Sequence, residues 1–329
     1  MSRTHLSDGI YKYFTALLSC SAILFISAIV FILITNSYPS FVVNGFKFFA
    51  TITWNPQLNG NIILVNGIRT LEGSSYGLLV FLAGTLISSA IAIILGVPAG
   101  IAIAVFLTQI APRKLSSPVS FFVELLAGIP SVVYGFWGLL VLAPFLQYTL
   151  EPSMAKYLSF IPLFSGPVYS AGMLASGIIL ALMIVPIIAS ISRDVMSQTP
   201  LELREGAKAI GLTNWEITRK IVLPYAKTGI IGAIILGLGR ALGETMAVAM
   251  VSGASINILP QTFFFPINTL AAFMALSLDS AFTDPTNMYV YALVELAVVL
   301  LVITMIVNVI ARALVKQGFI SSADKVVRV

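Results

Sequence analysis

The chain of 329 residues has almost none of the side chains that enzymes use for redox or hydrolytic chemistry. It contains one cysteine, Cys20, and one histidine, His5. These two residues cannot supply a disulfide framework, a zinc ligand set or a nucleophile with its histidine partner. A phosphate loop is also absent, because the glycine pair Gly206 and Gly211 is followed by Leu212 instead of lysine. We therefore expect no enzymatic activity, no cofactor and no metal, and any ATP hydrolysis must come from a separate protein.

Charge is equally scarce. Only 9% of the residues are charged and 58% are hydrophobic, with a mean hydropathy of +1.01. Such a chain has too little polar surface to cover a water-soluble globule. Its apolar runs continue without alternation for about 20 residues or more, which suits α-helices crossing a hydrocarbon core about 30 Å thick and argues against a membrane barrel. The predicted fold class is all-α, a polytopic transmembrane helical bundle.

Six apolar segments predict about six spans. They are residues 14–35, 76–107, 121–146, 171–191, 228–251 and 288–313. The first is too long for a signal-peptide core and lacks a small-x-small cleavage site after it, so we expect an uncleaved span. The second contains Pro98, which is expected to kink the helix unless the long helix tilts, and its Gly96 and Gly100 have the small-residue spacing that permits close helix packing. The predicted organisation is an N-terminal helix and outer loop (1–75), a transmembrane domain (76–315) and a cytoplasmic tail (316–329).

Basic residues between the spans predict the orientation of the chain. If the N-terminus is cytoplasmic, the outer segments hold only Lys47, Arg69 and Lys156, and the inner segments hold nearly all other lysines and arginines. This asymmetry satisfies the positive-inside rule with both termini in the cytoplasm. The net charge of +5 is therefore explained by topology and does not indicate nucleic-acid binding.

The long polar segment on the predicted inner side, residues 193–227, contains two helix-start patterns. The first is a capping box at Thr199–Glu202 with proline at the first helical position, and Gly211 is expected to end that helix. The second is Thr213–Glu216, and its helix is expected to stop before Pro224. The product is a compact helix-turn-helix. Connecting helices on the membrane surface and a DNA-reading unit are the alternatives, but a docking element fits better between two membrane spans.

Four ionisable side chains fall within or at the edges of predicted spans: Glu124, Arg240, Glu244 and Glu295. A charge at mid-bilayer costs about 2.5 to 3.5 kcal/mol on insertion scales, so each is a functional candidate. Arg240 and Glu244 are four residues apart, and an ion pair between them is one interpretation. For Arg240 we favour a role in binding an oxyanion, because guanidinium is a planar fork of donors and Gly239 and Gly243 leave space beside it.

The other two carboxylates are less informative. Glu124 precedes Gly128 and Pro130, so a packing or hinge role is as consistent with the sequence as a place on a substrate path. Glu295 stands alone among apolar residues, and the sequence assigns it no role.

One run within residues 193–227 resembles the EAA loop of ABC importer permeases. It consists of Glu205-Gly206-Ala207, then Gly211, then Ile221-Val222-Leu223-Pro224, with Gly206 in place of the usual alanine. The resemblance implies the type I ABC importer permease fold and a coupling helix that sits in a cleft of the ATPase subunit. The residues that would carry ATPase coupling are Glu205, Gly206, Ala207, Gly211, Leu223 and Pro224.

Two further stretches, residues 124–138 and 239–247, are similar to segments of phosphate permeases, and the first is more similar to the PstC family than to its PstA partner. The resemblance implies a PstA-like second permease subunit, a PstB-like cytoplasmic ATPase dimer and a PstS-like external phosphate-binding protein. The expected function is a permease subunit for inorganic phosphate, with Arg240, Glu244 and Glu124 on the substrate path. An ABC permease for sulfate or molybdate and an ATP-independent anion transporter are the alternatives. The second of these leaves the EAA-like loop unexplained.

Overall fold

The computed structural model describes the backbone of residues 2–326 and the side chains of residues 11–112, 114–310 and 312–313. In chain order the elements are α1 (Ser2–Asn44), α2 (Lys47–Ala50), β1 (Ile62–Val65), β2 (Ile68–Leu71), α3 (Leu79–Val105), η1 (Phe106–Ile110), α4 (Arg113–Ala127), α5 (Ser131–Trp137), η2 (Gly138–Leu142), α6 (Ala143–Phe145), η3 (Leu146–Leu150), α7 (Glu151–Tyr157), η4 (Pro162–Phe164), α8 (Met173–Ser197), α9 (Leu201–Ala209), α10 (Asn214–Ile217), η5 (Thr218–Val222), α11 (Leu223–Gly243), α12 (Met246–Val251), α13 (Leu270–Ala281) and α14 (Met288–Val326). The fold is helical, as predicted.

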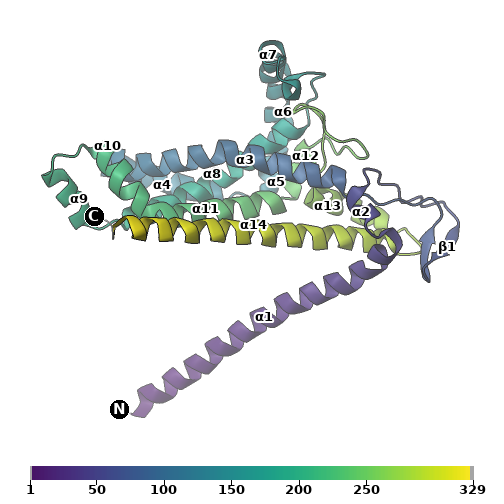
Figure 1. The fold of residues 1–329 in the computed structure, drawn as a ribbon, viewed down its shortest axis with the longest axis horizontal. Helices are drawn as coiled ribbons and strands as arrows, with labels where there is room; N and C mark the ends of the chain where they lie inside the picture. The colour runs from purple at the N-terminus through teal and green to yellow at the C-terminus, as the bar shows by residue number, and fades with distance from the viewer. Residues whose placement is uncertain (1, 327–329) are drawn as a thin grey trace.

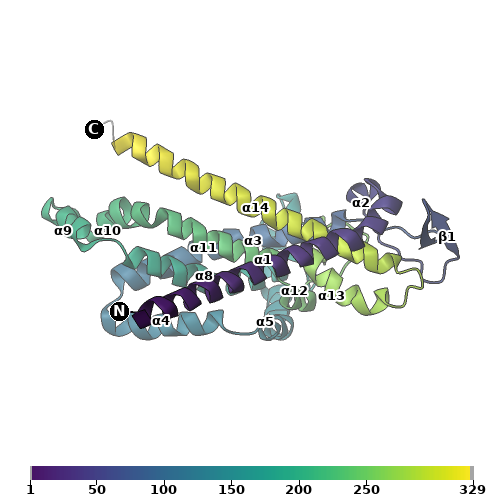
Figure 2. The same cartoon turned by 90° about the horizontal axis from the view of Figure 1, so that it is seen from below.

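Six helical stretches among the described residues are long and apolar enough to cross a membrane: Tyr11–Asn44, Leu79–Ile110, Ser131–Tyr157, Met173–Ser197, Asn214–Gly243 and Met288–Ile310. In Figures 1 and 2, α3, α8, α11 and α14 run along the long axis, α9 and α10 lie at one end, and α2 and β1 lie at the other. The stretch from α5 to α7 leaves the bundle sideways, and α1 diverges from it. The N-terminus and the end of α14 lie at the α9 end, which we call the coupling end.

Small residues hold the centre of the bundle together. A Cβ added to Gly96 of α3 would lie 2.8 Å from Ile184 of α8, and one added to Gly100 would lie 2.8 Å from Ile188. Real Cβ atoms essentially never approach so closely, so only glycine allows the two helices this separation. The predicted close-packing role of the glycine pair is confirmed, and α3 stays one helix through Pro98.

Four prolines follow a change of helical geometry, and in three of these cases the helix continues through the proline. Each π-helical turn in the described residues ends two residues before a proline: η1 before Pro112, η2 before Pro144, η3 before Pro152 and η5 before Pro224. Proline lacks an N–H and its ring crowds the carbonyl four residues earlier. The wider π turn places the backbone differently at that point, so three of these helices continue through the proline. The predicted helix end before Pro224 is therefore wrong.

Two spans differ from the predicted segments because their apolar runs contain a break. The predicted span 121–146 is divided: α4 ends at Ala127, and the candidate span starts at Ser131 after Gly128 and Pro130. The predicted span 228–251 is likewise divided at Glu244 and Thr245, between α11 and α12. Each break spans only two or three residues between apolar stretches, so the length of the apolar run alone did not reveal it.

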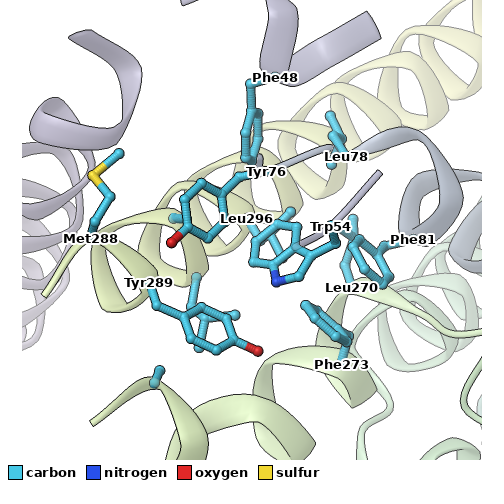
Figure 3. Packing of buried hydrophobic residues seen from close by; sticks show 13 residues of the cluster. Phe48, Trp54, Tyr76, Leu78, Phe81, Leu270, Phe273, Met288, Tyr289 and Leu296 are labelled. Carbon is cyan, nitrogen blue, oxygen red and sulfur yellow. The ribbon is translucent and has the colours of Figure 1, made fainter. Parts of the chain in front are cut away.

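An aromatic cluster closes the end of the bundle opposite α9. Figure 3 shows the Trp54 indole among Tyr76, Phe81, Phe273 and Tyr289. These rings bring together the N-terminal loop, α3, α13 and α14. Burial raises the pKa of the Tyr76 hydroxyl above its ordinary range, and the nearby Asp284 carboxylate raises it further. That hydroxyl therefore stays neutral inside the cluster.

The outer loop contains the one departure from an all-helical chain among the described residues. β1 and β2 form an antiparallel hairpin in which Val65 pairs with Ile68. The two residues between them, Asn66 and Gly67, both have positive φ, at 52° and 81°. Asn-Gly is the preferred pair for this two-residue turn because both positions need the left-handed region. The sequence pattern was present but was interpreted only as polar loop.

Candidate functional site

The two helix breaks lie against each other in the interior of the bundle. Gly135 of α5 follows the first break and Ala247 of α12 follows the second. A Cβ on Gly135 would lie 2.9 Å from the Cα of Ala247, so the two backbones are in direct contact. Broken helices expose unpaired backbone groups, which membrane proteins tolerate where the chain is packed on protein or lines a polar cavity. The breaks therefore define the candidate substrate path.

Arg240 lies one turn before the second break. It is in the last turn of α11, where the helix dipole favours a cation, and its side chain is partly buried. The Tyr134 hydroxyl, on the helix that follows the first break, donates to the Leu126 carbonyl at 2.9 Å. Arg240 Nε is buried without an acceptor among the described residues. A Cβ on Gly239 or Gly243 would meet no other atom within 4 Å.

Glu244 is buried but forms no ion pair with Arg240 among the described residues. Its ψ of 126° ends α11 at this residue and redirects the following chain into α12. Its Oε1 instead accepts a hydrogen bond from the Ala247 N–H at 3.3 Å. The carboxylate therefore caps the start of α12, where unpaired N–H groups and the helix dipole stabilise negative charge.

Glu124 is not brought to Arg240. It lies on α4 and accepts a hydrogen bond from Arg193 of α8 at 2.8 Å, while Arg193 also donates to Asp194 at 2.7 Å. The sequence analysis counted Arg193 only as a topology signal. Its pairing with a residue 69 positions earlier depends on how α4 packs on α8, so no local pattern indicates it.

The predicted helix-turn-helix is present at the coupling end. Gly211 has a φ of +85°, its N–H donates to Lys208 O at 2.9 Å, and the Leu212 N–H donates to Ala207 O at 3.1 Å. This is the left-handed helix end that favours glycine. The second capping box is also confirmed, with the Thr213 N–H donating to Glu216 Oε2 at 3.0 Å and the Glu216 N–H donating back to Thr213 Oγ1 at 3.3 Å.

The first capping box is wrong. Pro200 occupies the cap position, no side chain caps α9, and the Thr199 hydroxyl is buried without a partner among the described residues. With proline directly after it, Thr199 belongs to the tight turn that leaves α8 and does not present its oxygen to the first turn of α9.

The coupling element, residues 200–224, presents exposed apolar side chains at the coupling end of the bundle. Its exposed large hydrophobic side chains are Leu201, Leu203, Ile210 and Trp215. Glu205 and Gly206 are also exposed, whereas Ala207 is buried and Leu223 is partly buried against the cluster that contains Met196 and Val222. Exposed large apolar side chains on a polar segment make this element a candidate contact surface for a protein partner or the membrane.

These features define a class before any comparison: a multi-pass helical membrane protein with broken central helices, an interior arginine and a rigid apolar element at one end. The chain matches the family model "Binding-protein-dependent transport system inner membrane component" over residues 96–317. It belongs to that family, and within it to the group of PstC permease proteins described next.

Two curated relatives illustrate the similarity. The chain is 44% identical over 279 residues to "Phosphate transport system permease protein PstC 1" of Mycobacterium tuberculosis, which covers 83% of this chain and 82% of that one. It is 41% identical over 314 residues to PstC of Mesorhizobium japonicum, covering 94% and 90%. The chain is therefore a permease component of a binding-protein-dependent ABC transporter in the inner membrane, and it is not an enzyme.

A solved structure supports the fold. The bacterial alginate ABC transporter in complex with its alginate pentasaccharide-bound periplasmic protein matches 94% of this chain and 98% of its own, with a TM-score of 0.57 and 16% identity. At that identity the likeness concerns the fold alone, which is that of the type I ABC importer permeases.

Proposed function

We propose that this chain forms part of the path by which an ATP-driven importer moves inorganic phosphate across the cytoplasmic membrane. The observation that carries the proposal is Arg240, a partly buried guanidinium one turn before the break between α11 and α12, whose Nε is buried without an acceptor among the described residues. The names of the curated relatives agree with phosphate as the substrate. The remaining components would be a PstA-like permease, a PstB-like ATPase dimer and a PstS-like external binding protein, with both termini of this chain in the cytoplasm.

Arg240 suits phosphate for a physical reason. A guanidinium keeps its charge in an apolar setting and offers paired donors that match two phosphate oxygens. The site must draw the anion from water and still release it. Glu244, one turn away and held by the Ala247 N–H, places a fixed negative charge near the site and limits how tightly the anion is held.

Movement of the site would come from the coupling element. Closure of the ATPase dimer would displace residues 200–224, which continue without a break into α11 through η5. Arg240 lies at the far end of that same helix. A rigid helix therefore connects the proposed docking surface to the proposed substrate site, and the first 75 residues would form a separate helix and loop outside the 76–315 permease domain.

Radiolabelled phosphate uptake in cells without other phosphate importers tests this function. Arg240→Gln should lower apparent affinity roughly 10- to 100-fold, because a charge-assisted hydrogen bond contributes about 1.5 to 3 kcal/mol. Arg240→Lys should keep part of the uptake, since the charge survives but the paired donors do not. Glu244→Gln should alter turnover more than assembly. Arg312→Gln is the matched control, because Arg312 is exposed on α14 and belongs to neither the proposed substrate site nor the coupling element.

The same assay separates the alternatives. Competition by phosphate but not by sulfate or molybdate is expected, and vanadate should abolish uptake if ATP drives it. Wild-type uptake by Arg240→Gln at normal membrane abundance would remove Arg240 from the path.

A further inference from the structure

A second polar site lies at the coupling end, away from Arg240. It is a pocket of about 580 Å³ between α4, the end of α8 and α9. Its polar lining includes Ser116, Ser117, Ser120, Glu124, Arg193 and Arg204. Two guanidinium groups, one carboxylate and several hydroxyls therefore line one concavity, and a second carboxylate, Asp194, binds Arg193 at 2.7 Å beside it.

Hydrogen-bond donors exceed acceptors around this pocket. Arg204 Nη2 donates to Met196 O at 2.7 Å and Nη1 to Gln109 Oε1 at 3.4 Å, but Arg204 Nε and Gln109 Nε2 have no acceptor among the described residues. Leaving a buried donor unpaired costs roughly 1 to 3 kcal/mol. Arg193 is more fully paired, yet its partner Glu124 has a side chain that is 53% exposed. A water-exposed carboxylate holds its partner weakly and can be displaced.

The chemistry of the lining selects a class of ligand. Two guanidiniums repel cations, and an apolar ligand would leave the donors unsatisfied. A phosphate group has only acceptor oxygens, carries negative charge and matches the guanidinium fork. We propose that this pocket binds a phosphate group, with Arg193, Arg204 and the hydroxyls of Ser117 and Ser120 as donors, and that Glu124 competes with the ligand for Arg193.

Two sources supply this chemistry at the coupling end. One is inorganic phosphate that has crossed the membrane, in which case the inference rests on the proposed function. The other is a phospholipid headgroup, because α4 carries exposed Leu115, Phe122 and Leu125 beside the pocket. In both cases the ligand would join α4 and α8 to α9 through Arg204. Occupancy would therefore restrain the coupling element, which gives the pocket a regulatory consequence.

The test measures binding to the intact transporter complex, without its external binding protein, in a non-ionic detergent. An Arg240→Gln background removes the proposed path site, and uptake is not the readout, so failure here is distinct from failure of the proposed function. The probes are radiolabelled inorganic phosphate and native mass spectrometry of retained phospholipid. Ser120→Asp should weaken binding at least about tenfold, because it places a negative charge inside the pocket. Ser153→Asp, on exposed α7, is the matched control.

Glu124→Gln gives a result that misfolding cannot produce. Removing the competing carboxylate should tighten binding of the same probe. If Ser120→Asp weakens and Glu124→Gln tightens the binding of inorganic phosphate, the ligand is the free anion. If the two variants change the amount of retained phospholipid in this way, the ligand is a headgroup. If neither probe binds, or if Ser120→Asp and Glu124→Gln leave both unchanged, the pocket is not a phosphate site.

Discussion

At the scale of single residues, the three carboxylates that the sequence analysis placed in or beside the spans each accept a hydrogen bond. Glu124 accepts from Arg193 and Glu244 from the Ala247 backbone. Glu295 of α14, to which the sequence assigned no role, accepts a hydrogen bond from Ser40 of α1. Asn44 donates to the same Ser40 hydroxyl at 3.0 Å, so a short polar chain joins two otherwise apolar helices. This contact lies where α1 meets α14 before diverging from the bundle.

Removal of the Ser40 hydroxyl should lower the stability of the protein, because the buried Glu295 carboxylate loses its hydrogen-bond donor. Ser40→Ala is expected to destabilise the chain by about 1 to 3 kcal/mol, because Glu295 Oε1 already lacks a partner among the described residues and Oε2 would lose its own. Thermal unfolding of the detergent-purified protein measures the loss. Ser37→Ala is the matched control, since Ser37 is buried on the same helix but donates only to Ile34 O within it.

A double substitution distinguishes the pair from general packing. Replacing both partners with apolar groups removes the unmet polar atom, so Ser40→Ala combined with Glu295→Leu should be closer to wild type than Ser40→Ala alone. Simple additivity of the two losses would show that Ser40 does not act through Glu295.

At the scale of elements, the coupling element packs on the bundle through buried residues such as Ala207 and Val222, and its opposite side has no neighbouring atoms among the described residues. Gly206 and Gly211 have nothing within 4 Å of an added Cβ, although Gly211 also needs a positive φ. A Cβ at either position therefore meets no other atom of the described chain within 4 Å. A side chain there would extend from the surface on which we propose the ATPase docks.

Gly211→Trp should consequently abolish phosphate uptake while the protein remains inserted in the membrane. The strain of a non-glycine residue in the left-handed region costs about 1 kcal/mol, too little to unfold the chain. Gly211→Asn, which tolerates that region, and Gly206→Ala, which favours helix, are the controls and should retain most uptake. Uptake and membrane abundance are measured together. Normal uptake by Gly211→Trp would mean that this surface does not dock the ATPase.

At the scale of the whole molecule, the termini and the coupling element share one end, while the hairpin and the aromatic cluster share the other. The distribution of basic residues predicts that the first end faces the cytoplasm. Single cysteines introduced after Cys20→Ser test this orientation. A membrane-impermeant maleimide should label Leu64→Cys in intact spheroplasts, whereas Lys208→Cys should react only after permeabilisation. Both positions are exposed, so access is not limited by packing. The reverse labelling order would invert the topology.

The sequence alone was sufficient for features that depend on local patterns. Apolar length gave the number of spans, because hydrophobic thickness and helix rise fix how many residues cross. Gly211 and the Thr213–Glu216 box gave the turn of the coupling element, because left-handed backbone and capping are decided by adjacent residues. The glycine pair Gly96 and Gly100 gave a packing face for the same reason.

Only the tertiary structure decided the contacts between distant residues. Arg240 and Glu244 have the spacing of an ion pair, but the break at Glu244 gives the carboxylate to Ala247 and leaves the guanidinium without it. Likewise, Glu124 meets Arg193 only because α4 packs on α8. Helical spacing predicts which side chains share a face while the helix lasts. Where it breaks, and which helix lies opposite, depends on interactions across the whole bundle that no local pattern contains.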